Sequence, residues 1–246
     1  MTAMPQQILI LADDLRLLWF DPVDGTLFRP RGIGGGETRR TQEKLSGAAM
    51  LFELLNCGAA AQVPGRMSRT LRRFVEQGRA TAPMRVVATG TPPGRPELLA
   101  AWESLARRRR PCEPDLALAL ARRPFDPDER LVAAGVVERA AGTPRLTEHG
   151  RAVARSRRAE LDSYVLDGVR PAEGFTPTTL RLAGLLALSS GVWHGGVWQN
   201  PHRAPSATVE RRLVELRTEL ELGPDAPVWR TVERGVRAAT LNPASV

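Results

Sequence analysis

The sequence predicts a mostly α-helical protein: a single domain of residues 1–246 around a buried C-terminal helix, with short β-hairpin elements. Apolar residues recur at the three- and four-residue spacing of helices through most of the chain. Residues 180–188 are apolar nearly all round, which is typical of a buried helix. With 42% hydrophobic residues, the chain has the apolar material for one sizeable core or two small ones, and the lack of an internal repeat or dividing linker favours one domain.

The N-terminal quarter is predicted to hold a turn and a long helix after a disordered start at residues 1–7. Its leucine-rich opening ends at residues 21–25, where aspartate and glycine tolerate the backbone angles of a turn. The glycine-rich residues 32–36 are predicted to form a mobile loop. A helical pattern then runs over residues 41–56, and Gly58 stands where a left-handed helix cap is expected.

The second quarter is predicted to contain a basic helical segment, a strand and a helix that ends in arginines. Four arginines between Arg66 and Arg73 have the spacing of one helical face. Residues 86–88 fit a strand, and Pro96 suits the first position of the following helix. That helix ends at four consecutive arginines, residues 107–110.

The second half begins with the clearest helix start in the chain. Asp126 can accept a backbone N–H, and Pro127 suits the first helical position, so a helix is predicted up to Gly135. Two strand-like pieces, residues 136–137 and 145–147, are predicted to form a hairpin. Further helices are predicted at residues 151–166, from the opening residues 176–177 to residue 188, and as a C-terminal helical pair within residues 200–246.

The positive charge is concentrated in one quarter of the chain. The formal net charge is +8, and 34 of the 35 basic residues are arginine. Residues 61–123 hold 13 basic and 5 acidic residues, so this segment alone accounts for the excess. A concentrated positive field attracts polyanions, either nucleic acid or an anionic membrane surface. The alternative is a solvated arginine-rich surface without a ligand.

The sequence lacks the arrangements that enzyme catalysis commonly uses. It has no Gly-x-Ser-x-Gly elbow, and its only lysine, Lys44, is not part of a phosphate-binding loop. The three histidines are scattered, so no metal site is predicted. Cys57 is expected to pack at a helix end; Cys112 follows four arginines, which could lower its pKa, but no histidine lies near it in sequence. We therefore expect no enzymatic activity, no cofactor and no metal.

One stretch, residues 126–158, resembles the wing of winged-helix DNA-binding proteins. It combines a capped helix, a two-strand ribbon and a basic helix, and such families place a recognition helix in the major groove. Against this interpretation, the first helix carries three carboxylates, which phosphates would repel, and its segment has no excess of positive charge.

A second resemblance covers far more of the chain, from about residue 8 to 198. The order and spacing of several segments are similar to the Golgi phosphoprotein 3 family. These segments are a leucine run ending in an aspartate and glycine turn at residues 21–25, a small-residue helix at 45–54, a proline and glycine turn before a double leucine at 92–99, and a buried C-terminal helix at 166–186. The wing-like residues 130–137 also fit this family.

The resemblance implies a non-enzymatic, mostly helical domain that binds membranes peripherally. Eukaryotic members recognise phosphatidylinositol 4-phosphate and also hold the cytoplasmic tails of glycosyltransferases. Such a site needs arginine forks for the phosphate, an apolar edge and surrounding positive charge. The family's tryptophan is replaced by Phe28, and one of its arginines by the glycine and alanine at residues 47–48. A pair of arginines corresponds roughly to Arg122 and Arg123.

The candidate site residues follow from this resemblance and from the charge pattern. The predicted lipid phosphate ligands are Arg29, Arg31, Arg122 and Arg123, with Phe28 facing the membrane. The predicted basic patch consists of Arg107, Arg108, Arg109 and Arg110. The expected partners are an anionic phospholipid surface and the cytoplasmic tails of membrane proteins.

The expected location is cytoplasmic with peripheral membrane association. The longest apolar stretch, residues 180–193, is interrupted by Arg181 and is too short to span a bilayer, and the N-terminus lacks a signal-peptide pattern. Two alternatives stay open: a winged-helix nucleic-acid-binding regulator, and a protein-interaction scaffold that uses the apolar stripe of residues 209–220. For that stripe, an ordinary core-facing helix is the favoured interpretation.

Overall fold

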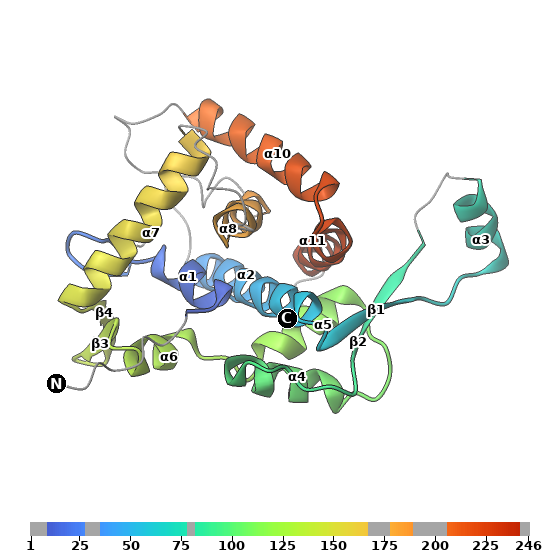
Figure 1. Ribbon diagram of the computed structural model, residues 1–246, viewed down its shortest axis with the longest axis horizontal. Helices are drawn as coiled ribbons and strands as arrows, with labels where there is room; N and C mark the ends of the chain where they lie inside the picture. Colours follow the sequence, from blue (N-terminus) through green and yellow to red (C-terminus); the bar gives the residue numbers. More distant parts are fainter. Residues whose placement is uncertain (1–8, 28–34, 78–81, 167–177, 189–205, 242–246) are drawn as a thin grey trace.

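The computed structural model describes residues 9–27, 35–77, 82–166, 178–188 and 206–241, and these residues form a mostly α-helical fold with two small antiparallel sheets (Figure 1). The helices are α1 (Leu11–Leu17), α2 (Gly35–Asn56), α3 (Arg69–Glu76), the 3₁₀-helix η1 (Pro96–Leu98), α4 (Leu99–Ala106), α5 (Pro114–Arg122), α6 (Pro127–Ala133), α7 (Glu148–Leu166), α8 (Thr178–Ala187), α10 (Ser206–Leu222) and α11 (Ala226–Leu241). The hairpins pair β1 (Ala60–Pro64) with β2 (Met84–Ala88), and β3 (Val137–Ala140) with β4 (Thr143–Leu146). The predicted disorder of residues 1–7 lies outside the described residues.

Helix α2 lies at the centre and contacts α1, α5, α8 and α11 (Figure 1). It begins at Gly35 rather than at the predicted Thr41, so the last two residues of the predicted glycine loop are helical. Gly47 allows α5 to approach closely, because a Cβ atom there would lie 2.7 Å from the carbonyl oxygen of Leu118. Gly58 follows the helix with a φ of +74°, which confirms the predicted left-handed cap.

The predicted C-terminal helices are present and face the core. Helix α8 buries six of its ten residues, as its apolar composition predicts. In α10, the stripe of Val209, Leu213, Leu216 and Leu220 is buried against the rest of the molecule. This stripe is therefore part of the core and does not serve as a partner-facing surface.

Strand β1 and helix α5 have no counterpart among the predicted elements. Helix α5 begins with Pro114 at its first turn and buries Ala117, Leu118 and Ala121. Its alternation of leucine and alanine has a period of two, which does not favour a helix over a strand. The helix is fixed by tertiary packing, since it lies between α2, α4 and α11.

Buried charge connects the N-terminal helix to the second half of the chain. Asp13 and Asp14 in α1 are buried, and each meets an arginine from another helix. Arg130 of α6 donates to Asp13 Oδ2 at 2.9 Å, and the Arg157 Nε of α7 lies 3.1 Å from Asp14 Oδ1. Burial raises the pKa of Asp14 to about 6, against the opposing effect of Arg157.

The wing-like segment folds close to its predicted form. Asp126 caps α6 by accepting from the backbone N–H groups of residues 128 and 129, as predicted. The hairpin turn falls at Ala141 and Gly142, which both have positive φ. The paired strands on either side of this turn are longer than the predicted pieces. Thr147 caps α7, since its Oγ1 accepts from the N–H of Gly150 at 2.9 Å.

Gly150 → Ala should strongly destabilise the protein. A Cβ atom at Gly150 would lie 1.9 Å from the backbone oxygen of Val136, and a backbone atom cannot move aside cheaply. Overpacking of this kind costs about 1–3 kcal/mol, and we expect a loss at the upper end in urea denaturation. The matched control is Gly90 → Ala, which has open space around the added methyl group and should leave the denaturation midpoint nearly unchanged. Equal midpoints for the two variants would contradict the close contact of α7 with Val136, the residue before β3.

Asp14 → Asn should remove a defined part of the pH dependence of stability. The folded-state pKa of about 6 lies above the ordinary value of 3.8, so between these values the folded state binds more protons than the unfolded state. This group therefore contributes stability that grows as the pH falls from about 7 to about 4. The total gain in the free energy of unfolding that Asp14 contributes over this pH range is at most about 3 kcal/mol. Urea denaturation at several pH values should show a smaller gain on acidification in Asp14 → Asn, whereas parallel curves for both proteins would be the contrary result.

Candidate anion-binding groove

The arginine run after α4 is held against the β1–β2 hairpin by a short backbone pairing. Val86 in β2 and Cys112 exchange two backbone hydrogen bonds, each 2.8 Å long. Helix α4 ends at Ala106, so residues 107–111 form a loop anchored at both of its ends. Arg109 has a φ of +44°, a left-handed conformation that non-glycine residues rarely adopt. This conformation helps the chain to reverse between α4 and the pairing with β2.

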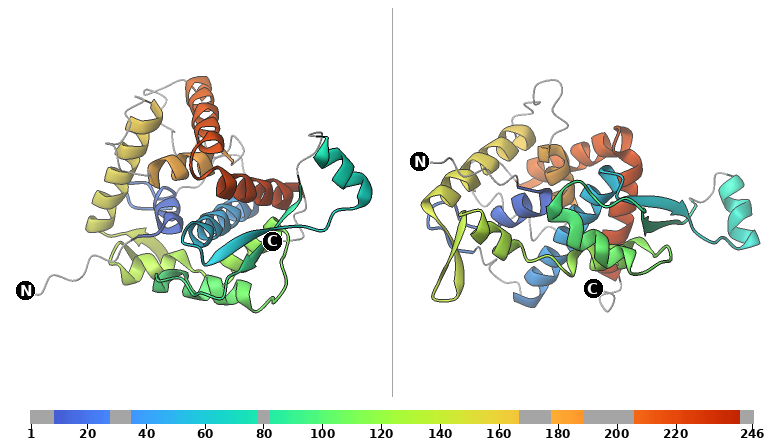
Figure 2. Two further views of the ribbon diagram at one scale, coloured as in Figure 1. Left: turned by 45° about the vertical axis from the view of Figure 1, so that its right-hand side comes forward. Right: turned by 60° about the horizontal axis from the view of Figure 1, so that its bottom comes forward.

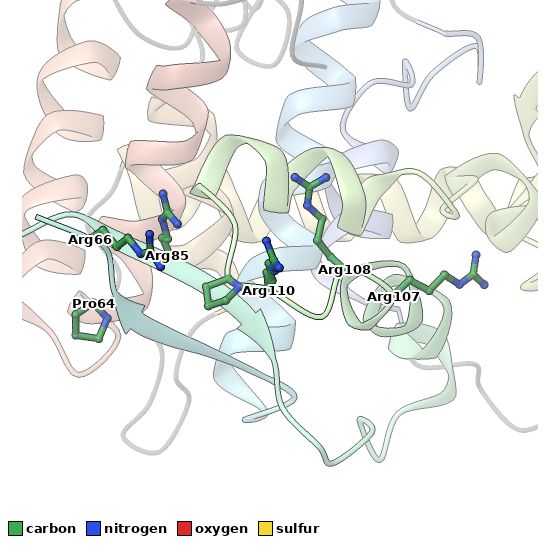
Figure 3. Close-up of a pocket in the computed structure, with 7 residues that line it drawn as sticks. Pro64, Arg66, Arg85, Arg107, Arg108 and Arg110 are labelled. Atoms are coloured by element: carbon green, nitrogen blue, oxygen red, sulfur yellow. The ribbon is translucent and has the colours of Figure 1, made fainter.

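An open groove of about 1120 Å³ lies between this loop and the hairpin (Figure 3). It is lined by Pro64, Arg66, Arg85, Arg107, Arg108, Arg110 and Pro111. The strand register places Arg85 opposite Val63, close to the end of β1, and Arg66 follows that strand. Three separate segments therefore contribute five arginines to one groove, and none of the described residues that line it carries a carboxylate.

The arginines of the groove are only partly neutralised by neighbouring carboxylates. Arg85 forms an ion pair of 2.8 Å with Glu113, and Arg107 approaches Glu103 at 3.8 Å. Within the described part of the chain, no ion pair is formed by Arg66, Arg108 or Arg110, and all three are exposed. In Figure 3, Arg107 extends away from the other four side chains. The groove thus carries at least three uncompensated positive charges.

A second, smaller pocket of about 510 Å³ shares residues with the groove. Arg107 and Arg108 line both, and Arg123 joins them here together with Leu120 and Pro124. Glu103 also lines this pocket, so its charge is more balanced than that of the groove. The basic surface consequently continues from the hairpin, past the loop, to the end of α5.

The structure places the predicted site residues in different surroundings. Of the predicted basic patch, three arginines line the groove and Arg109 does not. Arg123 is exposed at the smaller pocket, whereas Arg122 is partly buried and forms a 2.6 Å ion pair with Glu43. The other three predicted residues, Phe28, Arg29 and Arg31, lie outside the described residues.

Arg66 and Arg85 are groove residues that the sequence reasoning did not assign to a site. Both belong to the segment with the excess of positive charge, which was the available signal. Their place beside Arg108 and Arg110 depends on the β1–β2 register and on the Val86–Cys112 pairing. Neither of these contacts has a local sequence signature.

The surroundings of both cysteines differ from those expected. The pKa of the Cys112 thiol is raised by burial, which outweighs the opposite effect of Arg108, so the suggested lowering by the arginine run is wrong. Cys57 is exposed rather than packed as expected.

In the described segments, no group of three or more metal-ligating side chains comes together. None of the described helices combines the length and apolar character needed to cross a bilayer.

Comparisons with known proteins leave the groove as the main guide to function. No protein-family model matches this chain, and no curated protein sequence is significantly similar to it. Its function is therefore inferred from the arginines of the groove and from their surroundings.

Proposed function

We propose that this protein is a non-enzymatic peripheral membrane protein that binds anionic lipid head groups in the arginine groove. The observation that carries the proposal is the convergence of five arginines on a groove whose described lining residues include no carboxylate. Guanidinium groups donate paired hydrogen bonds to phosphate oxygens, which makes arginine well suited to phosphate recognition. A phosphorylated head group would also relieve the repulsion between Arg66, Arg108 and Arg110.

The proposal includes membership of the Golgi phosphoprotein 3 family, with a single domain in which α8 is buried and a cytoplasmic, membrane-peripheral location. The mostly α-helical fold and the buried α8 are compatible with that resemblance. By the resemblance, arginines of the family's phosphate site correspond to residues 47–48 and to Arg122, and a Cβ atom added at Gly47 would lie 3.4 Å from the Cβ of Arg122. Because Arg122 is already paired with Glu43, we assign the lipid phosphate to the groove instead.

A nucleic-acid-binding role is the second candidate, because α6, the β3–β4 hairpin and α7 follow one another as in a winged helix. The surface of α6 argues against it. Its exposed residues are Glu129, Val132 and Ala133, while Arg130 is turned toward Asp13. A recognition helix for DNA requires polar or basic side chains toward the bases and phosphates.

The test is vesicle co-sedimentation with phosphatidylcholine alone, with added phosphatidylserine, and with added phosphatidylinositol 4-phosphate. Duplex DNA serves as a competitor. We expect binding to anionic vesicles that weakens as salt rises, and the comparison of the two anionic lipids reports whether a head group is selected. Tight DNA binding without vesicle binding would favour the nucleic-acid role instead.

Arg108 → Gln/Arg110 → Gln should weaken binding to anionic vesicles by about thirtyfold, since each arginine near an anionic surface contributes about 1 kcal/mol. The matched control is Arg109 → Gln/Arg139 → Gln, which removes the same charge from two exposed residues that do not line the groove. We expect at most about a fivefold loss for this control. Equal losses in both double variants would show that net charge, not the groove, determines binding.

A further inference from the structure

Helix α3 projects from the helical body at the end of the β1–β2 hairpin, as Figures 1 and 2 show. None of its eight residues is buried. Among the described residues, neither hydrophobic core includes the apolar side chains of α3, and none of them packs against either core. The helix is nevertheless formed, because the Ser68 hydroxyl caps it by accepting from the N–H of Leu71 at 3.1 Å. A tertiary core therefore does not explain the sequence of this helix.

The side chains of α3 separate into two faces. At 100° per residue, Leu71, Phe74 and Val75 fall on one side of the helix, and the three arginines fall on the opposite side with Glu76. Phe74 is 43% exposed, which makes it one of the few large apolar side chains exposed in the described part of the chain. Such a strongly amphipathic helix with a basic polar face is typical of segments that lie in the interfacial layer of a membrane.

The position of α3 connects it with the arginine groove. Arg66 lines the groove and lies three residues before Arg69, the first residue of α3. The hairpin side of the groove and the helix therefore belong to one segment of chain, and a large partner at the groove would also meet the helix. A lipid leaflet offers negative phosphates for Arg66 and the basic face, and an apolar layer directly beneath them for Phe74.

We propose that α3 is a membrane-contacting arm, which inserts Leu71, Phe74 and Val75 into the boundary between head groups and acyl chains. This inference rests on the proposed function and adds a hydrophobic contact to its electrostatic one. The arm keeps its arginines at the level of the phosphates, where long basic side chains reach the polar layer. The two contributions differ physically, because salt screens the attraction of charges but does not weaken the burial of apolar surface.

Site-specific fluorescence tests the position of the arm. In a Cys57 → Ser background, which removes the exposed cysteine, a nitrobenzoxadiazole label is attached at Phe74 → Cys or, as the control, at Glu76 → Cys on the polar face. With phosphatidylserine-containing vesicles, we expect the label at 74 to brighten severalfold and to be quenched by acyl-chain nitroxide lipids. The label at 76 should change little.

The outcomes separate this inference from the proposed function. If labelled protein co-sediments with anionic vesicles and the label at 74 behaves like that at 76, the arm is refuted and lipid binding stands. If the protein does not co-sediment, both are overturned. If the label at 74 brightens without vesicles on addition of another protein, the arm is a protein-docking helix and the membrane inference is wrong.

Phe74 → Ser should weaken vesicle binding at high salt by about tenfold, because burying part of an aromatic side chain contributes about 1.5 kcal/mol. The matched control is Val214 → Ser, since Val214 is 62% exposed on α10, outside the hairpin. It should leave binding unchanged. Both variants should retain the urea midpoint of the parent, as neither side chain is buried. Unchanged high-salt binding in Phe74 → Ser would overturn the inference.

Discussion

The pairing of buried carboxylates with arginines from distant segments holds the N-terminal helix in place. Removing a carboxylate from water costs several kcal/mol unless a cation and hydrogen bonds replace the solvent. Asp13 meets this requirement through Arg130, whereas Arg157 compensates Asp14 only in part, so the pKa of Asp14 stays raised. The two arginines come from different helices. Helix α1 therefore has to lie against both α6 and α7. Arg16 reinforces the arrangement with two hydrogen bonds to Asp128, at 2.7 and 2.8 Å.

The need of a charged side chain for an opposite charge or for water also explains why the arginines of the groove differ from arginines elsewhere. Elsewhere many arginines meet carboxylates, for example Arg181 with Asp225 at 2.9 Å. Residues 61–123 have 13 basic and only 5 acidic residues, so complete pairing within this segment is impossible. Part of the surplus pairs with carboxylates from outside the segment, as Arg122 does with Glu43, and part remains exposed without a carboxylate partner, as Arg66, Arg108 and Arg110 do. The β1–β2 hairpin and the loop after α4 gather part of it in one groove instead of dispersing it.

Local signals predicted many elements of the fold correctly. Asp126 and Gly58 marked helix ends because their effects on the backbone are local, and the stripe of α10 was clear because its period is regular. Helix α5 was missed because its leucine and alanine residues alternate, and only packing against α2 and α11 decides its conformation. The predicted glycine loop, residues 32–36, overlaps the start of α2 at Gly35. The helix start was missed because glycine has a weak helix propensity.

The candidate site was predictable only as a region of excess charge. Arg107, Arg108 and Arg110 were found as a run, but their neighbours Arg66 and Arg85 come from other segments. What brings them together is the pairing of Val86 with Cys112, a contact between residues 26 positions apart that no local pattern reveals. The pKa of Cys112 was misjudged for a related reason: four adjacent arginines suggested activation, whereas burial beside β2 has the opposite and larger effect.

The choice between a membrane and a nucleic acid depends on more than positive charge. Either partner could neutralise Arg66, Arg108 and Arg110, since both present phosphates. A duplex, however, would leave the apolar face of α3 in water, because its outer surface has no apolar layer beneath the phosphates. A lipid leaflet accommodates both faces of this helix at the depths where they occur. The combination of a basic groove with an exposed apolar side chain, Phe74, on the hairpin that forms one side of it therefore favours the membrane.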